Sequence, residues 1–355
     1  MENARPIGER KAKHLSICLD PSLGSVEGSG AGFEGLSFAH RALPGLSWDE
    51  LDPAVDFLGK RIAFPFFISC MTGGSAEGFR VNRELALAAR ELGVPVGTGS
   101  IRVLLEHPEL ADHFRLKAHA PKVPLMGNIG AVQLRDLEPA RVDGLVELMG
   151  ADALVIHLNP GQELFEDDGD RDFRRLRESV AAFIDRAPYP VIVKETGFGI
   201  APSDARFLLD AGAAYVDLAG SGGTNWISVE GYRHDEASLE AALEFGDWGY
   251  RTAPLLAASP VEGGQILASG GLRTGMDVAK ALALGAAAAG MALPLARAAS
   301  EGGAKAVVAY GRRVERVLKT VMLLTGSRTV ADLRRPGVFS MTREFAGERD
   351  RIATA

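Results

Sequence analysis

The sequence predicts an α/β fold, a closed TIM (β/α)8 barrel with an N-terminal extension. Short apolar segments of strand-like composition alternate with helical patterns in a count close to eight, which is the repeat of this barrel. Nearly every apolar segment runs directly into Gly, Ser, Thr or Asn, and such residues suit the loops at one barrel mouth. The length of 355 residues and the 46% hydrophobic content fit one large barrel with extensions.

Eight segments are predicted as the parallel strands, because each is short, apolar and bounded by turn residues. They are 64–70, 94–97, 123–126, 153–156, 191–193, 215–218, 265–268 and 287–290. Helices are expected between the strands, for example at 82–92, 141–149, 203–211 and 276–284. A further helix is expected over about 172–186, since the charged turn at 169–173 would cap its start.

The chain divides into three predicted regions. Residues 1–60 form an N-terminal arm and extension, 61–330 the barrel that binds ligands, and 331–355 a C-terminal tail. Within the arm, 20–36 is rich in Gly and Ser and is expected to be a flexible loop. A long excursion at 227–264 follows the sixth strand, and long loops at this place on a barrel often act as lids.

Composition excludes several classes of partner and location. The net charge of −7 and the pI near 5.6 argue against nucleic acid or an anionic membrane surface. The longest apolar segment, 281–296, is shorter than the roughly 20 residues of a membrane helix and contains Pro294. The charged N-terminus lacks the apolar core of a signal peptide, and two cysteines, Cys18 and Cys70, suggest no disulfide framework. We therefore expect a cytoplasmic protein that holds any anionic ligand by local cations or a metal.

The fourth predicted strand ends in a dense group of polar side chains. His157, Asn159, Gln162 and Glu163 follow it directly, at the end of a strand where α/β barrels place their chemistry. This pattern points to an enzyme. The alternative is a polar loop that only caps the next helix.

The loops after the seventh and eighth strands have the character of a phosphate site. Gly271, Leu272 and Arg273 follow one strand, and Met291 and Ala292 follow the other. Loops at these positions in TIM barrels bind phosphate through backbone N–H groups and a helix N-terminus. A cofactor with a monophosphate tail fits here, although barrels that bind phosphorylated sugars use the same device.

Lys194, at the end of the fifth strand, narrows the choice of cofactor. An FMN across the barrel mouth needs a cation near the pyrimidine end of its ring, where reduction places negative charge. The amide and hydroxyl groups available beside it are those of Thr72, Ser100, Asn128 and Thr224. The rival interpretation is a Schiff-base lysine, which borohydride trapping of a substrate adduct would reveal.

Taken in order, these residues resemble the FMN-dependent type II isopentenyl-diphosphate isomerases over essentially the whole chain. Each motif alone is weak, but the ordered set is highly specific. The motifs are Arg10-Lys11-Ala12-Lys13-His14, Met71-Thr72-Gly73-Gly74, Gly99-Ser100-Ile101-Arg102, Gly127-Asn128-Ile129-Gly130, His157-Leu158-Asn159 with Gln162-Glu163, Gly169 to Phe173, Val193-Lys194-Glu195 with Gly197-Phe198-Gly199, Gly222 to Trp226, and Ala268 to Arg273.

The resemblance implies interconversion of isopentenyl and dimethylallyl diphosphate with reduced FMN, Mg²⁺ and NAD(P)H, and without net redox change. It implies that Gln162 contacts the substrate, that Glu163 ligates Mg²⁺, and that Gln162, Lys194 and His157 form the catalytic set. Substrate would be bound by Arg10, Lys11, Ser100, Arg102, His157, Asn159 and Gln162. FMN would be bound by Cys70, Met71, Thr72, Ser100, Asn128, Lys194, Thr224, Gly271, Leu272, Arg273, Met291 and Ala292. The same likeness suggests a homotetramer or homo-octamer.

Some of these residues have a simpler reading, and some positions depart from the family pattern. Arg10 and Lys11 also fit a charged arm exposed to solvent. Arg102 could form an ion pair with Glu106 across one helical turn, and His157 could be a buried imidazole whose hydrogen bonds are satisfied within the protein. Departures from the pattern stand at Lys13, Ile101, Cys70, Asp167 and Asp168, and of these only Cys70 is assigned a role above, as an FMN ligand.

Two other functions compete with the isomerase. An FMN-dependent 2-hydroxy-acid oxidase or dehydrogenase requires a His base and an Arg that binds the substrate carboxylate near the end of the sixth strand. This chain has Gly220-Ser221-Gly222-Gly223-Thr224 there, so the base is missing. A non-catalytic FMN store or sensor would be yellow and independent of Mg²⁺, but it does not account for Gln162 and Glu163.

Overall fold

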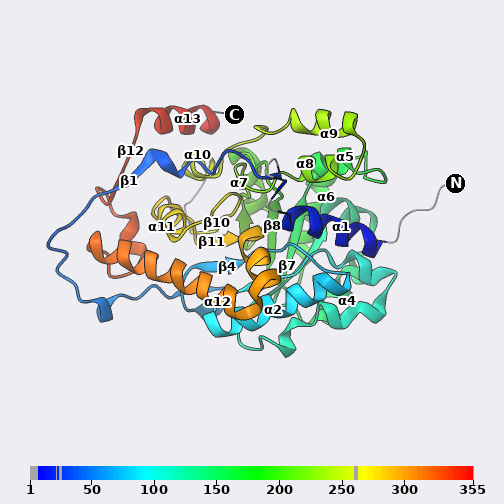
Figure 1. Ribbon diagram of the computed structural model, residues 1–355, viewed down its shortest axis with the longest axis horizontal. Coiled ribbons are helices and arrows are strands. Elements are labelled where there is room, and N and C mark those ends of the chain that lie inside the picture. The colour runs from blue at the N-terminus through cyan, green and yellow to red at the C-terminus, as the bar shows by residue number, and fades with distance from the viewer. Residues whose placement is uncertain (1–6, 21, 24–25, 260–262, 355) are drawn as a thin grey trace.

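The computed structural model describes residues 7–20, 22–23, 26–259 and 263–354, and its centre is a closed parallel barrel. The strand order is β10-β11-β4-β5-β6-β7-β8-β9, so the eight predicted strands are confirmed in a closed ring. The barrel lies at the middle of the molecule, with helices around it (Figure 1). The bounds are β4 Phe66–Ile68, β5 Val96–Gly97, β6 Leu125–Gly130, β7 Ala153–Leu158, β8 Val191–Glu195, β9 Tyr215–Asp217, β10 Ile266–Ala268 and β11 Ala288–Met291.

One end of the barrel is closed by an antiparallel hairpin, β2 Val55–Phe57 with β3 Lys60–Ile62. Its Phe57 is buried and stacks on Tyr215 at 4.8 Å and on Phe67 at 6.3 Å between ring centroids. Inside the barrel the hairpin packs on apolar side chains from alternating strand positions, including Met126, Val155, Ile192 and Leu267. Ligands therefore have the opposite end, where the strands finish, as their place to bind.

The outer helices follow the predicted pattern with shifts at their starts. They are α2 Ala76–Leu92, α3 Ala131–Asp136, α4 Pro139–Met149, α6 Leu176–Arg186, α7 Pro202–Asp210, α11 Gly275–Ala283 and α12 Leu293–Leu324. Helix α2 begins earlier than predicted because the Ser75 hydroxyl accepts a hydrogen bond from the Gly78 N–H and caps it. Helix α6 begins later than residue 172, since Arg175 has a left-handed φ of 62°.

Two antiparallel strands join the beginning and the end of the chain. Strand β1, Leu36–Phe38, pairs with β12, Phe339–Met341, and helix α13, Arg343–Ala353, packs on α10, Thr252–Ala258. Arg251 donates hydrogen bonds to the carboxylates of Glu34, just before β1, and of Glu348, in α13. The division into regions at residues 60 and 330 stays a prediction, although the last residues are bound to the body rather than extended from it.

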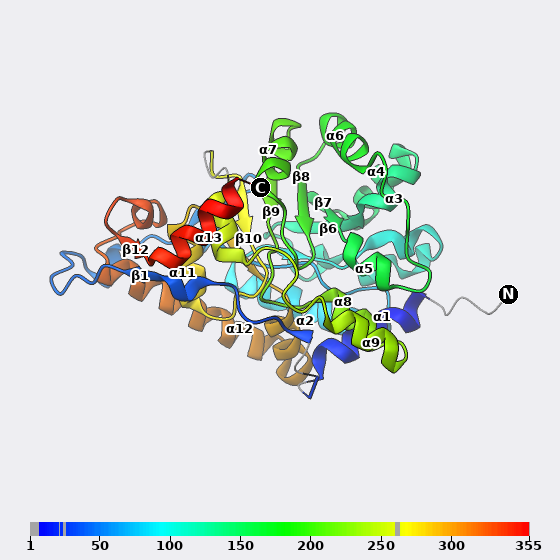
Figure 2. The same ribbon diagram turned by 90° about the horizontal axis from the view of Figure 1, so that it is seen from above.

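Helix α1, Ile7–Leu19, lies over the barrel mouth and packs beside α2, α8 and α12 (Figures 1 and 2). The segment after it was expected to be flexible, but its described part is fixed to neighbouring loops. The Gly28 N–H donates to the Gly223 carbonyl at 2.8 Å, and the Ala253 N–H donates to the Ala31 carbonyl at 2.8 Å. This segment therefore forms part of the wall around the mouth.

The excursion at 227–264 folds largely as helices rather than as an open loop. It contains most of α8, Trp226–Gly231, then α9, Glu236–Leu243, and α10. Its role as a lid stays a prediction. The apolar segment 281–296 covers the end of α11, strand β11 and the start of α12, and most of it is buried, as predicted. In the described ranges of the chain, no helix has the length and hydropathy needed to span a bilayer.

Candidate active site

Two adjoining pockets open at the carboxyl ends of the strands. The first, here the polar pocket, is lined by Arg10, Lys11 and His14 of α1 together with Ser100, Arg102, Asn128, His157, Asn159, Gln162, Glu163 and Glu166. The second, here the glycine pocket, is lined by Thr224, Ser269–Arg273 and 290–293. Cys70, Met71 and Lys194 line both pockets. Every site residue predicted from the sequence lines one of the two, so the fold brings the whole predicted set together.

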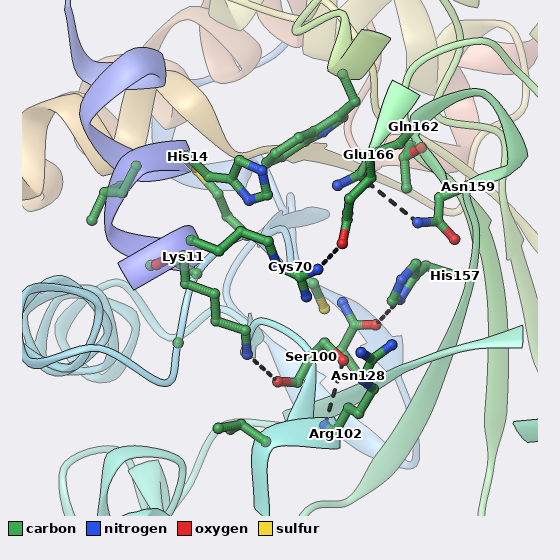
Figure 3. Close-up of a pocket in the computed structure, with 18 of the residues that line it drawn as sticks. Lys11, His14, Cys70, Ser100, Arg102, Asn128, His157, Asn159, Gln162 and Glu166 are labelled. Carbon is green, nitrogen blue, oxygen red and sulfur yellow. Dashed lines mark hydrogen bonds and ion pairs between the residues drawn. The ribbon is translucent and has the colours of Figure 1, made fainter. Parts of the chain in front are cut away.

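His157 stands at the end of β7 inside the polar pocket. Its Nδ1 lies 2.7 Å from the side-chain oxygen Oδ1 of Asn128, which belongs to the neighbouring strand β6 (Figure 3). Burial, followed by the charges of Lys194, Lys11 and Arg102, lowers the pKa of His157 to about 3. The ring is therefore neutral at physiological pH, and its contact with Asn128 joins a predicted substrate ligand to a predicted FMN ligand.

The short helix α5, Pro160–Phe165, arranges the polar group that follows β7. Asn159 Nδ2 donates to Glu163 Oε1 at 2.9 Å and to Gln162 Oε1 at 3.3 Å. The Asp170 N–H donates to the other oxygen of Glu163 at 3.0 Å. Asn159 and Glu163 are buried, and Asn159 makes no side-chain capping bond to α5 within the described structure, so the capping-only reading fails for it.

Three cations face this group from α1 and from the turn after β5. Lys11 Nζ donates to the Ser100 carbonyl at 2.9 Å, and Arg10 forms an ion pair with Glu166. Burial, with the charges of Arg10 and Arg102, lowers the pKa of Lys11 to about 7. Arg10 and Lys11 are thus not a solvated arm, and the described residues contain no ion pair between Arg102 and Glu106.

A buried carboxylate that the sequence analysis did not assign to the site lies behind Gln162. Glu230 of α8 has 0% exposure, accepts from Gln162 Nε2 at 3.0 Å, and lies 2.8 Å from His14 Nε2. Burial raises the pKa of Glu230, but His14, Arg233 and Gln162 outweigh this effect and lower it to about 2. No sequence signal joins Glu230 to Gln162, because α1, α5 and α8 meet only in the folded chain. Glu166, Trp226 and Thr196 are pocket residues missed in the same way.

The polypeptide backbone shapes the glycine pocket. Gly271 has a φ of +79°, and a Cβ there would come within 2.6 Å of the Gly222 backbone, so the loops after β9 and β10 touch directly. Helix α12 begins beside them at Leu293, and Ala292 makes no side-chain cap there within the described structure. Pro294 has no N–H, and the Leu295 and Ala296 N–H groups donate to the Ala292 carbonyl, so within the described structure the Leu293 N–H is the first-turn donor of α12 left for an anion.

Arg273 and Lys194 occupy different depths of this site. Arg273 Nε donates to Glu27 Oε1 at 3.0 Å, and Arg297 NH1 donates to Glu27 Oε2 at 2.8 Å, so Glu27 holds Arg273 in place. Lys194 is buried, and its Nζ donates to the Glu195 carbonyl. Burial raises the pKa of Cys70 to about 12, which keeps this neighbouring sulfur a neutral thiol.

The donor set of the two pockets fits an aromatic phosphate ligand better than a metal held by protein alone. The Thr196 hydroxyl is buried, lines both pockets and lacks a hydrogen-bond partner among the described residues. In the same described ranges, no three His, Cys, Asp or Glu side chains gather as a metal site. Glu163 alone therefore suits a cation held mainly by ligand oxygens and water.

Comparison with known proteins gives close relatives of similar length. A family model described as FMN-dependent dehydrogenase matches residues 162–339. An isopentenyl-diphosphate delta-isomerase from Borrelia garinii subsp. bavariensis is 41% identical over 332 residues, covering 93% of each chain. Another of that name, from Methanothrix thermoacetophila, is 41% identical and covers 96% of each chain.

Solved structures with the same fold are more distant in sequence. A flavocytochrome b2 variant with sulfite bound superposes with a TM-score of 0.67 at 19% identity, covering 93% of this chain and 83% of its own. An oxidised (S)-mandelate dehydrogenase superposes with a TM-score of 0.64 at 18% identity, covering 95% of this chain and 100% of its own. At this identity the likeness shows the barrel fold alone.

Proposed function

This chain belongs to the isopentenyl-diphosphate delta-isomerase family and carries an FMN-dependent dehydrogenase domain, and from that premise we propose that it interconverts isopentenyl and dimethylallyl diphosphate. The observation that carries the proposal is the junction of the two pockets. The polar pocket, rich in cations and amides, meets the glycine pocket at Cys70, Met71 and Lys194. A prenyl diphosphate in the first would lie against a flavin in the second.

FMN fits the glycine pocket through the backbone of two loops. Its phosphate would lie against Gly271, Leu272 and Arg273 and the N-terminus of α12 beside Met291 and Ala292. Its ring would reach Lys194, whose ammonium offsets negative charge at the pyrimidine end, and the polar groups of Thr72, Ser100, Asn128 and Thr224. Reduced FMN supplies the acid and base that this reaction needs. NAD(P)H would reduce it.

The diphosphate would bind across the polar pocket. Arg10, Lys11 and Arg102 offer positive charge in a chain of net charge −7, and His157, Asn159 and Ser100 add polar contacts. Mg²⁺ would bridge the diphosphate and Glu163, whose two oxygens are already oriented by Asn159 and the Asp170 N–H. The cation would thus take most of its ligands from substrate and water.

The protein side chains orient groups rather than move protons on their own. Moving an unactivated double bond requires a proton on one carbon and the loss of a proton from another, and ordinary carboxylates seldom achieve this. Gln162 is held from both sides, by Glu230 at its amide nitrogen and by Asn159 at its oxygen. Its remaining amide N–H is thereby directed, and it would position the five-carbon chain beside the ring.

The sharpest test is an anaerobic incubation of the purified protein with isopentenyl diphosphate, FMN, NADPH and Mg²⁺. We expect dimethylallyl diphosphate to form, and omission of FMN to abolish it. Oxidation of lactate or mandelate with bleaching of bound flavin, and no isomerisation, would instead favour the oxidase. A yellow protein with neither activity would favour the FMN store. The homotetramer or homo-octamer and the cytoplasmic location stay predictions.

Glu163 offers a test of the metal role. Glu163→Gln keeps the hydrogen bond from Asn159 but removes the negative charge, so we expect activity to fall and the Mg²⁺ concentration for half-maximal rate to rise by about tenfold or more. The measurement is a Mg²⁺ titration of the isomerase rate. A titration curve that superposes on that of the wild-type enzyme would exclude Glu163 as a ligand.

A further inference from the structure

We propose that Glu166 is an internal anion that competes with the substrate diphosphate for Arg10 and thereby sets how tightly diphosphates bind. This inference rests on the proposed function, because it takes Arg10 as a diphosphate ligand. The contact joins two elements far apart in the sequence, α1 and the end of α5. It makes Glu166 an affinity-setting residue rather than a catalytic one.

The position of the pair supports direct competition. Arg10 and Glu166 both line the polar pocket, and they form an ion pair with 19% and 8% of their side-chain areas exposed. Figure 3 shows the Glu166 side chain extending into the pocket, between His14 on one side and Asn159 on the other. A diphosphate that binds Arg10 must displace this carboxylate or share the guanidinium with it.

The other cations of the pocket are not neutralised in this way. Lys11 Nζ and Lys194 Nζ donate to the backbone carbonyls of Ser100 and Glu195, and Arg102 has no carboxylate partner among the described residues. Arg10 is therefore the cation whose positive charge a neighbouring side chain already offsets. Removing that offset strengthens the attraction of the pocket for an anion.

Glu166 is also held less firmly than the other carboxylate of this turn. Glu163 accepts hydrogen bonds on both oxygens, from Asn159 and from the Asp170 N–H. The carboxylate of Glu166 has Arg10 as its one bonded partner within the described chain. A diphosphate that replaces Glu166 on Arg10 thus breaks one ion pair of that carboxylate, whereas Glu163 keeps both of its hydrogen bonds as a candidate metal ligand.

The test compares Glu166→Gln with a matched control, Asp168→Asn. Both changes remove one negative charge from the same turn, but Asp168 is exposed and has no bonded partner in the described structure. The probe is inorganic pyrophosphate, titrated calorimetrically into the FMN-loaded protein with Mg²⁺. We expect Glu166→Gln to bind it about fivefold more tightly, the effect of a partly exposed ion pair. Asp168→Asn should stay within about twofold of wild type.

Isomerase kinetics give a second readout. The KM for isopentenyl diphosphate should fall in Glu166→Gln by the same factor as the pyrophosphate Kd, with a smaller change in kcat. A structural role for the pair would instead lower the melting temperature without tighter binding. Glu166→Ala repeats the measurement with a smaller side chain, should the glutamine form its own bond to Arg10.

A double-mutant cycle isolates the competition. In an Arg10→Ala background, Glu166→Gln should change the pyrophosphate Kd by less than about twofold, because no shared guanidinium remains. Equal gains in both backgrounds, or weaker binding with a higher Mg²⁺ requirement in Glu166→Gln, would overturn the proposal. If the cycle behaves as expected but wild-type protein forms no dimethylallyl diphosphate, the proposed function fails and the competition stands.

Discussion

At the residue scale, the titration of Lys11 links the polar pocket to pH. With a pKa near 7 instead of 10.5, Lys11 is cationic below about pH 7 and neutral above it. A bound diphosphate favours the cation, so we expect pyrophosphate to bind progressively more weakly as the pH rises from about 6 to 9. Calorimetry in two buffers of different ionisation enthalpy should also detect proton uptake near pH 8. Lys11→Gln should flatten both dependences.

The same residue has the opposite effect on folding. Between pH 7 and 10.5 the unfolded chain keeps the Lys11 proton while the folded chain has lost it. The contribution of Lys11 to the free energy of unfolding therefore rises with pH across this window. If pyrophosphate affinity falls with rising pH while the free energy of unfolding increases, the group that titrates is a buried cation, as assigned to Lys11. Parallel changes in both quantities would contradict the assignment.

Glu230 provides a second prediction at this scale. Glu230→Gln removes the charge that partners His14 and Arg233, and its new amide can donate to Gln162 and turn that side chain over. We expect kcat to fall by about tenfold or more with a smaller change in KM, and a lower melting temperature, because a buried ion pair loses one partner. The exposed Glu240→Gln is the control. Loss of stability alone, with normal kcat in the folded fraction, would exclude a positioning role.

At the scale of elements, the contact between the loops after β9 and β10 shapes the glycine pocket, which is the proposed site of the FMN phosphate. Gly271→Ala would place a methyl group within 2.6 Å of the Gly222 backbone at a positive φ, so the cradle must open. We expect purified Gly271→Ala to lose its yellow colour, measured as FMN absorbance per polypeptide. Gly144→Ala in α4 has nothing described within 4 Å of its new Cβ and should retain the flavin. A fully yellow Gly271→Ala would place the FMN phosphate elsewhere.

The elements also show which features a sequence can reveal. Barrel strands and outer helices were predictable because each carries its own apolar period and its own turn residues, as in β7 and α11. The ends of the helices were less predictable. The start of α2 depends on the cap formed by Ser75, and the start of α6 depends on the left-handed backbone of Arg175. The β1–β12 pairing and the hairpin that plugs the barrel were not predicted, because both depend on contacts between distant or short segments with no period of their own.

The residues of the candidate site also fall into those that the sequence predicts and those that only the folded structure reveals. Residues in the last positions of a strand or just after it, such as Lys194 and Asn159, share the barrel mouth by the topology of the fold, so their position at one site follows from the strand assignment. Glu166 lines the polar pocket from the end of α5, and Glu230 lies behind Gln162 on α8, and both bond to side chains of α1. Only the three-dimensional packing of these helices shows that Gln162 and Arg10 each have an acidic partner.

At the scale of the whole molecule, the apolar plug of the barrel and the two pockets occupy opposite ends of the barrel. Phe57 is fully buried in the plug, away from both pockets. We expect Phe57→Ala to lower the free energy of unfolding by about 3–5 kcal/mol through the cavity it leaves. Urea denaturation measures this loss, and FMN content of the folded fraction should stay normal. Leu43→Ala, at a side chain 93% exposed, should have little effect on either quantity.

The placement of α1 has a practical consequence. Its Cys18 is wholly buried and lines both pockets, and burial raises the pKa of this thiol to about 12. An alkylating reagent can attack the sulfur only after the helix lifts from the barrel, since neither access nor thiolate exists before that event. The rate at which iodoacetamide labels Cys18 would therefore report how often α1 lifts from the barrel. A slower rate in the presence of pyrophosphate would show that bound ligand reduces this opening.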